Sequence, residues 1–191
     1  MFKTTLIKTI LSAAIAAAVV LPGAGFAQAA TMNTPAASAL NKADQKIVAG
    51  MAQANIAEIE AGKLALANSQ NPEVKAFAQQ MVDDHTKALN DVKALAEAKG
   101  VTIPTEQDAK HKAMAAKLSK MTGAAFDKAY MKQAGLDDHK AVHAKLKKDQ
   151  AQAKDPDVKA LAAKMIPTVE QHLHSATGLH GAKGNATAAK K

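Results

Sequence analysis

Histidine and carboxylate side chains interrupt the apolar faces of four amphipathic segments in this sequence. In each segment apolar residues recur at helical spacing, and the face that they form must be buried. The polar exceptions, one in each segment, are Glu58, His85, His139 and His172. Imidazole nitrogens and carboxylate oxygens are common ligands of zinc, iron, copper and nickel. The pattern therefore predicts a mononuclear transition-metal site wherever the four segments converge.

Three further residues are expected to support such a site. His143 follows His139 by four residues on the same helical face and is a candidate additional ligand. Asp84 and Asp138 each stand directly before a histidine in a repeated Asp-Asp-His sequence, and they are candidates to orient an imidazole ring. Inward-facing methionines such as Met81 would suit Cu(I), although methionine at core spacing usually only packs.

The same polar residues have a second interpretation. Buried polar groups must be hydrogen-bonded, so histidines paired with Glu58 or with neighbouring aspartates could fix the register of the helices without any metal. Both interpretations stay open at the level of the sequence. Approach of the four sets of ligand atoms within about 5 Å would favour the metal site. Histidines at different levels, or facing solvent, would exclude it.

Four long helices are needed to position these residues. An Asn71-Pro72 pair and an Asp155-Pro156 pair each predict a helix start, and the eight residues that begin at Asn71 recur from Asp155. Two helical hairpins joined by a long connection predict an all-α, up-down four-helix bundle with a short extra helix between the second and third helices. The expected long helices are 42–68, 72–99, 124–153 and 156–177, and the short one is about 106–120.

The heights of the four polar residues can be compared along these helices. In an up-down bundle the tight turns near residues 70 and 154 are expected to lie at the same end. At a rise of 1.5 Å per residue the four positions then differ in height by roughly 8 Å. Stagger between helices could absorb that difference, so convergence is compatible with the sequence.

Composition excludes several classes of function. The 191 residues carry a net charge of +8, no Cys and only 3% aromatic residues, and every one of the 25 basic residues is Lys. Thiol chemistry and disulfides are therefore excluded, and without Arg or stacking aromatics a nucleic-acid partner is not expected. The lysine-rich surface is expected to be solvated, with weak association with anionic envelope surfaces as an additional expectation.

The two ends of the chain are expected to lie outside the bundle. Residues 1–29 have a basic start, an apolar run and an Ala27-Gln28-Ala29 cleavage motif, which predict a signal peptide cleaved before Ala30. About 12 apolar residues are too few to span a bilayer, so the mature protein is expected to be periplasmic or secreted and without a transmembrane helix. Residues 30–41 are predicted to be a flexible leader, 42–177 the bundle, and 178–191 a disordered basic tail.

Several stretches of the predicted bundle are similar to the sequence motifs of a known protein family. They are residues 55–65, 74–87 and 98–101 with Pro104, followed by residues 126–131, 138–140, 155–160 and 167–173. Together they resemble bacterial domain-of-unknown-function family 4142 over about residues 42–177. That resemblance implies an exported, ferritin-like four-helix bundle and implies no activity. One departure is Gln133-Ala134-Gly135, where relatives have bulkier residues; it is expected to loosen the third helix beside His139.

The ferritin-like resemblance does not extend to a di-iron centre. Such centres use a glutamate three residues before a histidine on two helices. Here the residues three before the candidate histidines are Val82, Leu136 and Val169. The leading prediction is thus a non-enzymatic, exported, stress-related bundle of the envelope with one zinc, iron or copper ion. A structural or protein-interaction module is the alternative, and a metal-dependent redox or hydrolytic enzyme is a weaker one.

Overall fold

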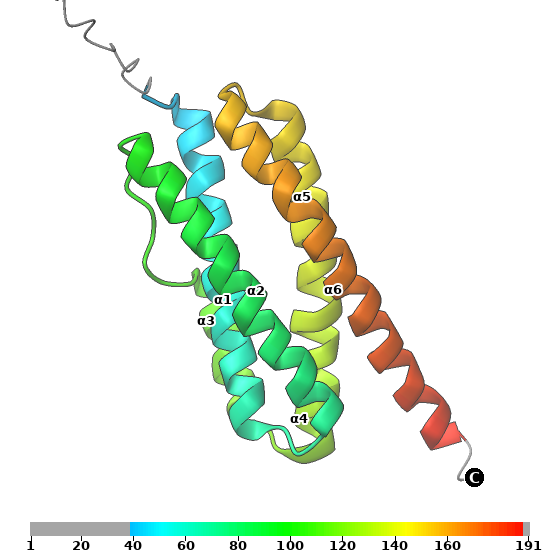
Figure 1. Ribbon diagram of the computed structural model, residues 1–191. Coiled ribbons are helices and arrows are strands. Elements are labelled where there is room, and N and C mark those ends of the chain that lie inside the picture. The colour runs from blue at the N-terminus through cyan, green and yellow to red at the C-terminus, as the bar shows by residue number, and fades with distance from the viewer. Residues whose placement is uncertain (1–38, 189–191) are drawn as a thin grey trace, which may run out of the picture. The chain divides into compact units, whose positions relative to one another are not determined.

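The computed structural model describes residues 39–188, and within that range every regular element is helical (Figure 1). Four long rods form a bundle, and the third rod consists of three elements joined end to end. The elements are α1 (Lys42–Asn68), α2 (Pro72–Ala98), α3 (Ala109–Leu118), α4 (Gly123–Tyr130), the π-helical η1 (Met131–Asp138), α5 (His139–Gln152) and α6 (Pro156–Ala188). The predicted all-α four-helix bundle with a short extra helix in its connection is therefore confirmed.

The predicted signal peptide and most of the predicted leader lie outside the described residues. Among the residues that are described, no helix combines the length and apolar character needed to cross a membrane.

Local capping explains why α2 and α6 begin where the sequence predicts. The Oδ1 atom of Asn71 accepts hydrogen bonds of 2.8 and 3.4 Å from the backbone N–H groups of Glu73 and Val74, the second and third residues of α2. Asp155 does the same for α6 at 2.9 and 3.2 Å. Pro72 and Pro156 occupy the first helical position, where a missing N–H costs nothing. The repeated motif thus starts one helix in each half of the chain.

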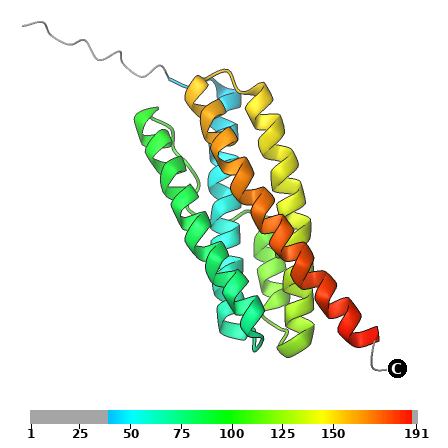
Figure 2. The ribbon, with the colours of Figure 1, turned by 45° about the vertical axis from the view of Figure 1, so that its right-hand side comes forward.

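The two tight turns lie at opposite ends of the bundle, so the predicted up-down order, in which both turns share one end, is not observed. At one end, the buried carboxylate of Asp44 accepts hydrogen bonds from the backbone N–H groups of Lys154 (3.1 Å) and Asp155 (2.8 Å). At the other end, the Ser69 hydroxyl donates to Asp127 at 2.5 Å. The connection through α3 returns along the bundle, so that α2 and the third rod run in the same direction (Figure 2).

The candidate residues nevertheless lie at similar heights, because each is near the middle of its rod. Counting from either end of a rod then gives nearly the same height.

The layer formed by the four candidate residues separates two apolar clusters. One cluster contains Val48, Val92 and Val158, and the other contains Phe77 and Phe126.

The third rod departs from the single α-helix that the sequence predicts. Residues Met131–Asp138 form a π-helix, and the predicted weak point at Gln133-Ala134-Gly135 lies within it. A Cβ atom on Gly135 would lie 3.2 Å from the Met131 methyl group and 3.3 Å from Ala176 on α6. The wide turn therefore brings the backbone of η1 close against α6, immediately before His139.

The last helix is longer than expected. α6 continues past Thr177 to Ala188, so residues 178–188 are helical where the sequence predicts the start of a disordered tail; the rest of that predicted tail lies outside the described residues. A glycine inside a helix costs only about 1 kcal/mol relative to alanine. Leu179 packs against the apolar cluster that contains Phe77, and this contact continues the buried face beyond the glycine.

Candidate metal centre

Three of the four sequence-predicted ligands converge in the layer between the two apolar clusters. His85 lies on α2, His139 at the start of α5 and His172 on α6, and one nitrogen from each ring lies within 4.8 Å of the other two. Their ring centroids are 5.2 to 5.6 Å apart. The exposed fractions are 4%, 1% and 0%, so bulk water does not reach the point where the rings meet.

The hydrogen bonds of His85 establish which of its nitrogens is free. Its Nδ1 lies 2.9 Å from Oδ1 of Asn55 on α1. The amide of Asn55 is oriented by its own Nδ2, which donates to the Met51 carbonyl at 2.8 Å. Because Oδ1 can only accept, His85 donates through Nδ1–H, and its neutral ring carries a lone pair on Nε2. That buried Nε2 has no hydrogen-bond partner among the described residues.

The same reasoning applies to the other two rings. His139 Nδ1 lies 2.7 Å from the carbonyl oxygen of Ala134 in η1 and must donate to it, which leaves the lone pair on Nε2. His172 Nε2 lies 2.9 Å from Oδ2 of Asp84, so its proton is placed there and its lone pair is on Nδ1. His139 Nε2 and His172 Nδ1 then face each other at 3.3 Å without a proton between them.

Electrostatics keep these rings neutral. Burial, together with the charges that His139 and His172 would carry, lowers the pKa of His85 well below 6.5. Burial also lowers the pKa of His139 and of His172, and in His172 the hydrogen bond to Asp84 only partly opposes it. At neutral pH all three lone pairs are therefore available without loss of a proton.

The separation between the facing nitrogens of His139 and His172 fits a metal ion. Zinc binds imidazole nitrogen at about 2.0–2.1 Å, and two such ligands at the tetrahedral angle are roughly 3.4 Å apart. The observed separation of 3.3 Å between His139 and His172 is close to that value. Each second ring nitrogen donates to an oxygen of Asn55, Ala134 or Asp84, which is how metal-binding histidines are usually held in orientation.

Glu58, the fourth sequence-predicted ligand, lies outside this converging group. Its Oε1 is 3.7 Å from Nδ1 of His139, the nitrogen that donates to Ala134, and its Oε2 has no hydrogen-bond partner among the described residues. Burial, assisted by the charge of Asp138, raises the pKa of Glu58 from 4.5 to about 8. The side chain is therefore a neutral acid at pH 7.

The two aspartates predicted to orient the rings have different positions. Asp84 orients a histidine, although it is His172 on another helix and not its neighbour His85. Among the described residues Asp138 forms no hydrogen bond with the three rings; it pairs with Lys110 on α3 at 2.6 Å and lies 3.7 Å from His111. Burial acts to raise the pKa of Asp138, yet the neighbouring Lys110 and His111 lower it overall.

His143, the candidate additional ligand, is turned away from the centre. Its Nε2 contacts Glu170 on α6 at 2.7 Å near the surface.

Sequence reasoning missed two groups that hold the rings. Asn55 precedes Glu58 by three residues and follows Met51 by four, so its helical spacing was a signal for an inward polar residue. The carbonyl of Ala134 gave no signal, because its position depends on the π-helical turn.

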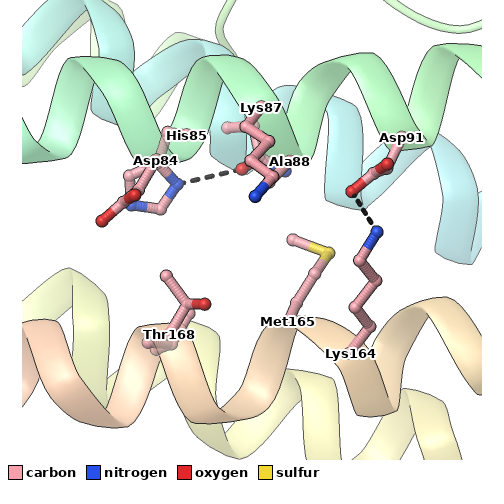
Figure 3. Close-up of a pocket in the computed structure, with 10 residues that line it drawn as sticks. Asp84, His85, Lys87, Ala88, Asp91, Lys164, Met165 and Thr168 are labelled. Carbon is pink, nitrogen blue, oxygen red and sulfur yellow. Dashed lines mark hydrogen bonds and ion pairs between the residues drawn. The ribbon is translucent and has the colours of Figure 1, made fainter.

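Two cavities adjoin the centre. A cavity of about 120 Å³ lies between α2 and α6 and reaches His85 (Figure 3). A second cavity, of about 10 Å³, is lined by Glu58, His85 and His139 inside the bundle. His85 and Met165 line both cavities.

Known structures share this fold. A fragment of DUF305 from Deinococcus radiodurans is similar with a TM-score of 0.67 and 16% identity, over 75% of this chain and 98% of that one. CopM in its Cu(II)-bound form is similar with a TM-score of 0.60 and 16% identity, over 72% of this chain and 95% of that one. At this identity the likeness concerns the fold alone. Among curated proteins none matches significantly. The family model for a domain of unknown function, DUF4142, matches residues 29–179.

Proposed function

We propose that this chain, which belongs to the DUF4142 family, is an exported helical bundle of the bacterial envelope that binds one transition-metal ion through His85, His139 and His172. Export is supported by the sequence of residues 1–29. In this proposal the protein holds the metal ion in the envelope. The proposal includes a role of the metal-binding protein under stress.

One observation carries the metal site: one nitrogen from each of three buried imidazole rings lies within 4.8 Å of the other two, and the hydrogen bonds of each ring leave one of its nitrogens without a proton. A layer that only fixed helix register would satisfy its buried polar atoms. Here His85 Nε2 is unpartnered and two lone pairs face each other at 3.3 Å. A metal ion would satisfy all three nitrogens, which favours the metal site over the structural alternative.

The three imidazole ligands limit which metal ions suit the site. Three neutral imidazoles without a thiolate suit zinc and copper, and iron is the third ion to test. The Cu(II) in the CopM structure supports including copper. We propose that Glu58 does not bind the ion but remains a neutral acid beside His139.

Metal content tests the proposal. The mature protein, purified without an affinity tag, is loaded separately with Zn(II), Cu(II) or Fe(II), desalted and subjected to elemental analysis. We expect about one equivalent of at least one metal, and its loss in His85→Ala. His174→Ala, which alters an exposed histidine of α6, is the matched control and should retain the metal. Absence of all three metals from the wild type, or equal content in His85→Ala, would contradict the proposal.

Asn55 should act on the affinity without binding the metal. In Asn55→Ala the ring of His85 loses the acceptor for its Nδ1–H, so we expect metal affinity to fall about 10- to 100-fold. Asn68→Ala is the control, because Asn68 also lies on α1 and also donates to a carbonyl four residues earlier. Competition with a chromophoric chelator measures both. Equal affinities in the two variants would show that His85 does not need this hydrogen bond.

A further inference from the structure

The cavity between α2 and α6 is the part of the structure where a solvent-sized space reaches the metal centre. It measures about 120 Å³, and Figure 3 shows Asp84 and His85 of α2 across from Met165 and Thr168 of α6. His139 and His172 are almost completely buried and do not line it. His85 is therefore the one member of the histidine group that borders this space.

The wall between this cavity and the interior is thin. The small inner cavity, lined by Glu58 and His139, shares Asn55, His85 and Met165 with the outer one. Methionine has an unbranched, flexible side chain, and His85 is held by a single hydrogen bond. Met165 and the His85 ring are therefore the parts of this shared wall that are able to move.

The outer side of the cavity is bridged by one ion pair. Lys164 on α6 donates to Asp91 on α2 at 2.8 Å, and both side chains are partly exposed, at 61% and 35%. An exposed ion pair of this kind is weak and forms and breaks readily. Asp84, whose side chain is 38% exposed, lies at the same cavity and contacts His172 directly.

We propose that this cavity is the route by which a hydrated metal cation enters and leaves the three-histidine site, and that the Lys164–Asp91 pair and Met165 control the rate. The space is large enough for several water molecules, which suits a cation with part of its hydration shell. Carboxylates of Asp84 and Asp91 face the passing cation, and His85 receives it first. This inference rests on the proposed function, because it requires that the histidines bind a metal.

Exchange kinetics test the route separately from binding. The rates of Zn(II) loading and of Zn(II) release to a chelator are measured by stopped flow, and the affinity by competition at equilibrium. Thr168→Phe fills the cavity, and we expect both rates to fall about tenfold or more while the affinity changes little. Lys164→Ala removes the bridging ion pair, and both rates should rise severalfold.

Glu170→Gln is the matched control, because it breaks the α5–α6 pair with His143 and does not line the cavity. Its rates should equal those of the wild type. Wild-type rates in both Thr168→Phe and Lys164→Ala would overturn the route even if every protein binds one metal ion. If Thr168→Phe does not fold, the loading and release rates of Lys164→Ala alone test the route. A wild type that binds no Zn(II), Cu(II) or Fe(II) overturns the proposed function, and the route with it.

Discussion

Binding of one metal ion should raise the free energy of unfolding by about 4 kcal/mol when the free ion exceeds its dissociation constant a thousandfold, and His139→Ala should abolish the increase. The increase follows from mass action, because the ion binds the folded site and the unfolded chain does not bring the three histidines together. His139 provides the nitrogen that faces His172 at 3.3 Å. Its removal leaves two ligands on separate helices, which no longer surround the ion.

Denaturant titration with and without the metal measures this effect. His143→Ala is the matched control, since His143 also lies on α5 but pairs with Glu170 near the surface. The control should keep the full stabilisation by metal. A wild type with the same unfolding midpoint in the presence and absence of Zn(II), Cu(II) and Fe(II) would contradict the prediction. So would a His139→Ala variant that is stabilised as much as the wild type.

The starts of α2 and α6 were predictable because local groups determine them. Asn71 and Asp155 satisfy N–H groups only two and three residues away, so their effect depends on neighbouring residues alone. The four inward polar residues were predictable for a similar reason. Helical spacing places them on buried faces whatever the order of the helices in the bundle.

The direction of the rods was not predictable in the same way. The connection between α2 and α4 is long enough to reach either end of the bundle, so the two turns could lie together or apart. Interactions distant in sequence, such as those of Asp44 with Lys154 and of Ser69 with Asp127, accompany the observed choice. The predicted similarity in height of the four polar residues holds even though the turns lie at opposite ends, because each residue lies near the middle of its helix.

The hydrogen-bond partners of the three histidine rings could not be predicted from the apolar periodicity of the sequence. A rotation of α2 by one residue decides whether Asp84 faces solvent or His172, and the structure places it against His172. The π-helical turn of η1 decides which carbonyl meets His139. It also decides that Asp138 faces α3 and pairs with Lys110. Apolar patterns identify a buried face but not these rotations.

Glu58 should cost the metal-free protein an increasing amount of stability as the pH rises from 5 to 8, and Glu58→Gln should remove that cost. The pKa of Glu58 is raised from 4.5 to about 8, mainly because burial disfavours its charged form. Between these values the folded state keeps a proton that the unfolded state has released. Stability from this group is therefore complete below pH 4.5 and is lost as the pH rises toward 8. The slope reaches at most about 1.4 kcal/mol per pH unit.

The difference between Glu58→Gln and the wild type isolates this one group. Glutamine is a neutral side chain of nearly the same shape, so the two proteins should differ least near pH 5, and the variant should become progressively more stable toward pH 8. The lowered histidine pKa values act equally in both proteins and cancel. Urea denaturation with a chelator present gives the free energies, and Glu60→Gln, which alters an exposed partner of Lys63, is the control. A difference that stays constant over this range would mean that Glu58 is already ionised in the folded protein. In that case it would be free to act as a fourth ligand, because only the charged carboxylate binds a metal ion well.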